Sequence, residues 1–168
     1  MKFPRTIRLD SSDLYVFKPA AEPGEWAVPG SFAFANRTPE DLDGKARQAF
    51  QSGWLGTDSF GRATLVEVAE IPEAAFFAVV ECLARHFVTA YGAPDLAAAL
   101  PAARAEADDS ASLCDHKVHT LLAIERAFTD DGITERVRVV TPERARDHAK
   151  IWTLVEDAEP DDRDNGTV

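Results

Sequence analysis

A β-hairpin predicted from Val118 to Val140 is the feature of this sequence that most constrains the fold. The turn sequence Thr129-Asp130-Asp131-Gly132 sets Phe128 opposite Ile133. A shifted turn would change every partner and lose two opposite-charge pairs, so the register is strongly specified. Continued from the turn, the register gives the pairs Ile124–Val137, Leu122–Val139, Arg126–Glu135 and Glu125–Arg136.

The rest of the chain predicts further strands and helices around this hairpin. Alternating or continuous apolar runs predict strands at 7–9 and 14–17, which form a hairpin, and at 32–35, 63–68 and 151–155. Capping residues and apolar stripes predict helices at 38–53, 72–91, 95–111 and 141–149. The expected fold is α+β, a mainly antiparallel sheet of about six or seven strands with the 72–91 helix packed on one face.

Two of the helices carry more detailed expectations. Residues 74–80 are apolar on every side, so this half of the long helix should be covered all round. Pro101 should break or kink the next helix, because proline lacks the N–H that a helix interior needs. Residues 102–111 are small or charged and should lie at the surface.

Length and charge indicate one domain and exclude several partner classes. We expect a globular domain over residues 1–156 and an acidic, disordered tail over 157–168. A net charge of −11 disfavours nucleic acid and anionic membrane surfaces as partners. The start of the chain lacks a signal peptide, charged residues interrupt the 72–91 segment, and two cysteines make no disulfide framework. A cytoplasmic protein is therefore expected.

The segment Cys114-Asp115-His116-Lys117-Val118-His119 gathers one of two cysteines and two of four histidines. Cys114, His116 and His119 could be three ligands of a zinc or other transition-metal site, with a fourth ligand from elsewhere. A strand or a helix would each bring only two of the three to one side, so only a bent loop could gather them. The alternative is two surface histidines beside a small buried thiol, and on that alternative no cofactor is expected.

Three other features could carry function. His86 lies four residues after Cys82 on the long helix. This spacing would suit a nucleophilic thiol and its base, but the pair could equally be a core thiol and an ordinary helix histidine. Trp26, between two Pro-Gly turns, could contact a ligand or anchor its loop in the core. Backbone N–H groups of the 56–61 loop could surround an anion, but the loop lacks a P-loop lysine and precedes a strand, which favours a plain connection.

The N-terminal third resembles a known family. Residues 2–10, Lys-Phe-Pro-Arg-Thr-Ile-Arg-Leu-Asp, and residues 22–32, Glu-Pro-Gly-Glu-Trp-Ala-Val-Pro-Gly-Ser-Phe, are similar to a family of short bacterial proteins of unknown function. The resemblance extends over the globular part, to about residue 157. It implies a bacterial, cytoplasmic setting and no assigned activity, cofactor or catalytic residue.

These observations favour a non-catalytic binding or accessory module over an enzyme, because the sequence offers no coherent catalytic constellation. Such a module could associate with itself, as a homodimer, or with a protein partner, through a sheet edge or a helix face. Two alternatives remain open. One is a small metal-dependent enzyme that uses the Cys/His cluster, and the other is a small-molecule-binding protein with a pocket between the sheet and the Trp26 loop.

Overall fold

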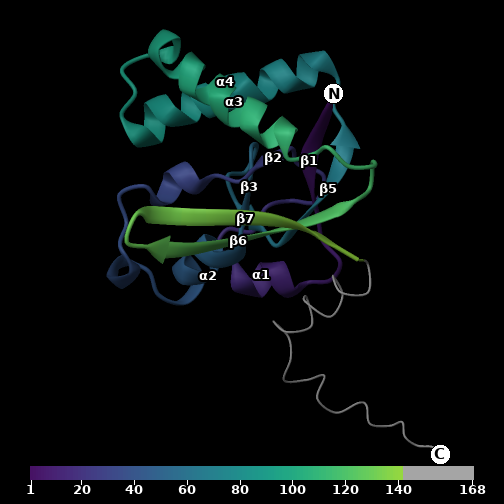
Figure 1. Ribbon diagram of the computed structural model, residues 1–168. Coiled ribbons are helices and arrows are strands. Elements are labelled where there is room, and N and C mark those ends of the chain that lie inside the picture. Colours follow the sequence, from purple (N-terminus) through teal and green to yellow (C-terminus); the bar gives the residue numbers. More distant parts are fainter. Residues whose placement is uncertain (142–168) are drawn as a thin grey trace, which may run out of the picture.

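The computed structural model describes residues 1–141, which form seven strands and a layer of two long helices over them (Figure 1). The α+β class, the seven strands and the antiparallel pairing are confirmed. The strands divide into two sheets, however, where the sequence predicted one. One sheet has the order β1-β5-β6-β7, with strands Lys2–Ile7, Leu65–Glu70, Leu121–Thr129 and Gly132–Val140. The other has the order β2-β3-β4, with strands Ala27–Val28, Trp54–Gly56 and Arg62–Ala63.

The β6–β7 hairpin has the register that the sequence predicts, from Phe128 opposite Ile133 to Leu122 opposite Val139, including both opposite-charge pairs. The strand begins at Leu121 and not at Val118. The reason is a turn in which Thr120 N donates to Lys117 O and His119 adopts a left-handed backbone with φ 76°.

The two long helices are confirmed, and they differ from prediction in how they are buried. Helix α3, Glu73–Tyr91, ends where Gly92 takes a left-handed conformation at φ 78°. Helix α4, Leu96–Ser112, begins where Asp95 Oδ1 accepts a hydrogen bond from Ala98 N at 2.8 Å. It continues through Pro101, which lies on the exposed side, where water can satisfy the carbonyl that proline leaves unpaired.

The prediction of a surface position for residues 102–111 fails along one side of the helix. Four small residues of α4, Ala99, Ala103, Ala107 and Ser110, are buried, and the first three belong to the core cluster that α3 forms. Their spacing of three or four residues places them on one stripe, and their small side chains let the two helices approach closely.

The prediction that residues 74–80 are covered all round is also wrong, because α3 is buried on one side only. Phe76, Val79 and Val80 lie in the core, whereas Phe77 is 46% exposed. By length and composition alone, α3 is the one helix within residues 1–141 that could cross a membrane, and only 28% of its most apolar window is buried.

The N-terminal predictions fail at three places. Residues 12–16 form helix α1 (Ser12–Val16) and not a strand, because Ser12 N donates to Asp10 Oδ1 and Asp13 bonds to Thr64. Residues 31–34 form the 3₁₀ helix η1 (Ser31–Phe34). The predicted 38–53 helix is divided into η2 (Pro39–Asp41) and α2 (Gly44–Ser52).

The predictions for 141–149, 151–155 and the 157–168 tail lie outside the described residues, apart from Thr141, which is in neither helix nor strand.

Candidate functional site

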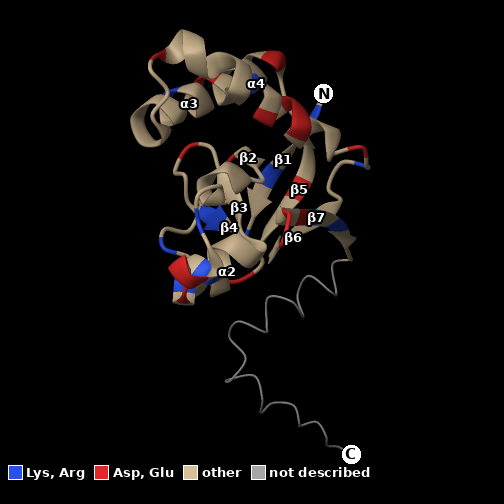
Figure 2. Cartoon of the chain, turned by 60° about the vertical axis from the view of Figure 1, so that its left-hand side comes forward, with Lys and Arg blue, Asp and Glu red and all other residues tan. Residues whose placement is uncertain are grey.

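A groove of about 300 Å³ lies between α2, η1 and the end of α3. Four of its lining residues are cations: Lys18, Arg37, Lys45 and Arg62. No carboxylate lines it, although the chain carries a net charge of −11. Figure 2 turns this side forward, and Lys and Arg segments are visible around β4 and α2, beneath the two long helices. The remaining lining residues are apolar or aromatic: Pro19, Ala33, Phe34, Leu42, Ala46, Ala49, Phe60 and Tyr91.

Arg62 forms part of the groove wall although its side chain is buried. Its Nη1 donates to the carbonyls of Pro29 and Gly53 at 3.1 and 3.0 Å, and its Nη2 donates to that of Gly30 at 3.1 Å. The guanidinium carbon lies 4.8 Å from the centre of the Phe34 ring, a cation–π distance. Within residues 1–141, Arg62 forms no ion pair with a carboxylate.

A second buried guanidinium, that of Arg126 on β6, raises the positive potential beside Arg62. Arg126 donates to the carbonyls of Pro29, Phe50 and Gly53, and it pairs with Glu135 at 3.1 Å. Burial, followed by repulsion from Arg126, lowers the pKa of Arg62 to about 9. Arg62 therefore stays charged at neutral pH. Glu106 and Glu135 attract its charge, but no carboxylate of residues 1–141 lies within ion-pair distance of it.

Phe60 forms the aromatic wall of the groove in an unusual backbone conformation. Its φ is 55°, in the left-handed region that side-chain-bearing residues rarely adopt. The next residue must be glycine for the chain to pass this close to Ala20. A Cβ at Gly61 would lie only 2.5 Å from the backbone carbonyl of Ala20. The Phe60 ring stacks on His86, with ring centres 3.8 Å apart and planes 7° from parallel. The backbone is thus held so that an aromatic face lies at the groove.

The structure separates His86 from Trp26, the two residues predicted to contact a ligand. His86 lies behind Phe60, among Phe32 and Tyr91, and burial lowers its pKa. Trp26 packs edge-on to Phe3, and the guanidinium carbon of Arg5 lies 5.6 Å from the centre of its ring. Trp26 is therefore a partly buried anchor of its loop, and His86 supports the groove wall from behind.

The structure does not bring together Cys114, His116 and His119. Cys114 is buried below the end of α4, His116 is exposed, and His119 Nδ1 lies 2.9 Å from Glu67 Oε1. Within residues 1–141, no three His, Cys, Asp or Glu side chains converge as metal ligands would. The chain does bend after Ser112, but the bend places the thiol inside and the two imidazoles outside.

Cys114 should react slowly with alkylating reagents. Burial raises the pKa of its thiol to about 12, so little thiolate, the nucleophilic and metal-binding form, exists at neutral pH. We expect iodoacetamide to modify Cys114 more than about tenfold more slowly than the half-buried Cys82. Peptide mapping after timed alkylation would measure both rates, and unfolding in urea should remove the difference. Equal rates in the folded protein would contradict a buried, protonated Cys114.

The 56–61 loop does hold an anion, and that anion is the protein's own Glu25. Its Oε1 accepts from Asp58 N and Ser59 N at 3.0 and 2.8 Å, and its Oε2 accepts from Ser59 Oγ and Glu22 N, both at 2.6 Å. These bonds lower the pKa of Glu25 despite the opposing effect of burial. The N–H groups of Asp58 and Ser59 are therefore already occupied and do not face a ligand.

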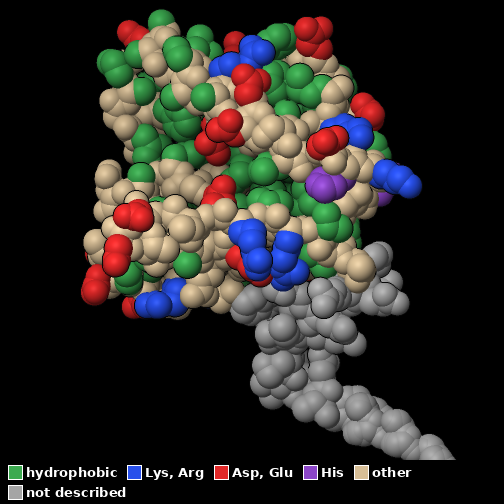
Figure 3. All heavy atoms as spheres, in the orientation of Figure 1, with side chains coloured by type: hydrophobic (Ala, Val, Ile, Leu, Met, Phe, Trp, Pro, Cys, Tyr) green, Lys and Arg blue, Asp and Glu red, His purple; other side chains and the backbone are tan. Residues whose placement is uncertain are grey.

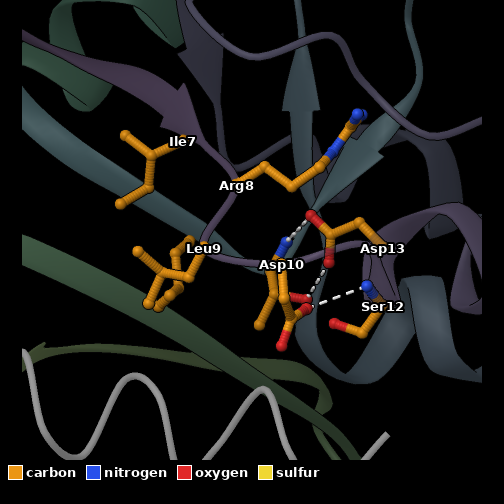
Figure 4. A pocket seen from close by; sticks show the side chains of 8 residues that line it. Ile7, Arg8, Leu9, Asp10, Ser12 and Asp13 are labelled. Carbon is orange, nitrogen blue, oxygen red and sulfur yellow. Dashed lines mark hydrogen bonds between the residues drawn. The ribbon is translucent and has the colours of Figure 1, made fainter. Parts of the chain in front are cut away.

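A small cavity beside α1 gathers the carboxylates of Asp10 and Asp13 near Arg8 (Figure 4). Its volume is about 10 Å³, the space of roughly one water molecule. Both carboxylates have internal partners: Asp10 accepts from Ser12 N at 2.8 Å, and Asp13 accepts from Thr64 Oγ1 at 2.6 Å. Burial raises the pKa of Asp13. This arrangement ties α1 to the residue before β5 and has no room for a substrate.

Comparison with known proteins identifies the family but no activity. A model of a family of unknown function, DUF6505, matches residues 1–156. The chain belongs to the DUF6505 family. No curated protein and no solved structure matches it. The match to the family ends at residue 156, the last residue of the predicted globular domain. Because the family has no described function, the groove must be interpreted from its own chemistry.

Sequence reasoning missed the groove of this DUF6505 protein. Its cations come from positions 18, 37, 45 and 62, each in a different segment, so no run of basic residues marks the site. The only local signal was Phe60-Gly61-Arg62, at the end of the loop that was considered as an anion cradle. That loop does border the cation-lined groove, through Phe60 and the adjoining Arg62 and not through its backbone N–H groups.

Proposed function

We propose that this protein is a non-catalytic, cytoplasmic binding module that holds a small organic anion in the groove over Arg62. The observation that carries the proposal is a buried arginine without an adjacent carboxylate, in a groove lined by three further cations. Buried charges in proteins are normally paired, because an uncompensated charge removed from water is costly. Glu106 and Glu135 attract Arg62, and Glu135 is already paired with Arg126, so a bound anion would supply the direct partner that Arg62 lacks within residues 1–141.

The groove also indicates the size and shape of the anion. Its volume of about 300 Å³ lies at the small end of the range for ligand pockets. Phe60 and Tyr91 offer aromatic surface beside the cations, which suits a planar ring that bears a carboxylate or phosphate. Lys18, Lys45 and Tyr91 are the lining residues with an ionisable amine or hydroxyl, and the lining contains no carboxylate, imidazole or thiol to act with them, which favours binding over catalysis.

Isothermal titration calorimetry with phenyl phosphate, benzoate and inorganic phosphate tests this function. We expect phenyl phosphate and benzoate to bind, inorganic phosphate to bind more weakly, and every affinity to fall as salt is raised. An Arg37→Ala Lys45→Ala double variant should weaken phenyl phosphate binding by about tenfold or more, while the fold is kept, because both side chains are exposed.

The matched control is Arg136→Ala Arg138→Ala, which removes the same charge from β7, away from the groove. The control should bind phenyl phosphate almost as the unaltered protein does. The proposal fails if none of the three probes binds, or if the two double variants weaken binding equally, because the effect would then reflect overall charge.

A further inference from the structure

The outward side of the α3–α4 pair is largely apolar and uncovered. Phe77 on α3 is 46% exposed, and Leu96 and Leu100 on α4 are 44% and 40% exposed. The guanidinium of Arg104 lies 5.7 Å from the Phe77 ring, and Leu100 and Leu96 precede Arg104 by one and two helical turns. All four residues therefore line one side of the pair, which we call the outer helical face. Figure 3 shows hydrophobic side chains spread over the top of the molecule, where these helices lie.

A contiguous apolar surface of this kind usually marks an interaction site. Most large apolar side chains of α3 lie in the core or pack against it, and Phe77 and Tyr91 are the two that are exposed. The charges on this side form two exposed i,i+4 pairs, Glu81 with Arg85 and Arg104 with Asp108. An anionic membrane is a poor partner for a chain whose net charge is −11.

The long edge strand β7 could also mediate self-association, but its charge pattern opposes it. In a two-fold antiparallel pairing that continues the sheet, residues opposite each other share a face, so their numbers sum to an even number. A register centred on residue 135 would place Glu135 opposite Glu135 of the second copy. A register centred on residue 136 would likewise place Arg136 opposite Arg136. A register centred on 137 would set Arg136 against Arg138. Like charges at directly opposed positions destabilise a strand pair, which protects this edge.

We propose that the outer helical face binds a second copy of this chain, related by a two-fold axis. Helices of 19 and 17 residues are about 28 and 25 Å long and about 10 Å wide, so the face covers roughly 500 Å² on each copy. Two such faces bury about 1,000 Å², which reaches the lower limit for a specific interface. Glu81 and Arg85 are self-complementary across a two-fold axis. In an antiparallel α3–α3 contact centred between them, Glu81 of each copy lies opposite Arg85 of the other.

Sedimentation equilibrium over micromolar to millimolar concentrations tests the dimer. We expect a monomer–dimer equilibrium in the unaltered chain and an approximately 100-fold weaker association in Phe77→Glu Leu100→Glu, which places four charges in the interface. The matched control, Leu14→Glu Tyr15→Glu, adds the same charges at exposed apolar positions of α1 and should associate as the unaltered chain does. Circular dichroism would confirm that each variant is folded.

Charge reversal separates a specific two-fold contact from general stickiness. Glu81→Arg should weaken association several-fold, because it sets arginines of the two copies together, and adding Arg85→Glu should restore it. A monomer at every concentration, or equal weakening by the α1 control, would overturn the proposal. A dimer that survives Phe77→Glu Leu100→Glu would also overturn it, by showing that the interface lies elsewhere. The groove variants should leave the association unchanged, so the two proposals can fail independently.

Discussion

Replacing Arg126 with methionine should lower the free energy of unfolding by about 3–5 kcal/mol, because several buried carbonyls lose their donor at once. The Arg126 side chain is fully buried, and its Nη1 donates to the carbonyls of Phe50 and Gly53 at 2.8 and 3.0 Å. Methionine fills a similar volume but leaves these carbonyls, and the Glu135 carboxylate, without their donor. Urea denaturation followed by circular dichroism would measure the loss.

Arg126 joins three segments that are distant in the sequence. Through its hydrogen bonds it fixes the end of α2, the Pro29–Ser31 turn and strand β7 to one another. Lysine at this position should recover little stability, because one ammonium cannot reproduce the planar fork that reaches several carbonyls.

Arg136→Met is the control for this prediction. Arg136 lies on the neighbouring strand and pairs with Glu125, but its side chain is 71% exposed, so its loss should change stability by less than about 1 kcal/mol. Similar losses in the two variants would show that the carbonyl network around Arg126 does not stabilise the fold.

The parts of the fold that sequence reasoning predicted are those set by local pattern. The β6–β7 register follows from a turn sequence and two opposite-charge pairs, and every partner agrees with the structure. Helix α3 and the Asp95 cap follow from helical spacing and capping chemistry. Each depends on residues within one segment, so long-range contacts did not override them.

The N-terminal predictions failed where polar side chains bond to distant segments. Asp13 looked like part of a turn, but its carboxylate accepts from Thr64, 51 residues away, and α1 forms around that contact. Arg126 was correctly paired with Glu135, yet nothing in the strand pattern shows that it is buried against α2. The groove fails to show in the sequence for the same reason, because its cations meet only after the two sheets have formed.

Replacing Glu25 with alanine should lower the free energy of unfolding by about 3 kcal/mol, because four donors lose the buried carboxylate that accepts from them. The close approach of this carboxylate also depends on Gly56, where a Cβ would lie 2.4 Å from Glu25 Oε1. Glu22→Ala is the control, since that side chain is exposed and its backbone N–H remains to donate. A small loss at Glu25, equal to that at Glu22, would mean that water replaces the carboxylate without cost.

The pH dependence of stability identifies the charged carboxylate as the stabilising form. The pKa of Glu25 in the folded chain is lowered below its ordinary value of 4.5, so the folded state binds this proton less tightly than the unfolded state does. The resulting stabilisation is complete at pH values above 4.5 and is lost as the pH falls through the lowered pKa. Glu25→Gln keeps the shape of the side chain but cannot ionise, so its deficit in unfolding free energy should be constant near neutral pH and shrink below pH 4.5. A deficit that stays the same in acid would show that shape, and not charge, holds the 56–61 loop.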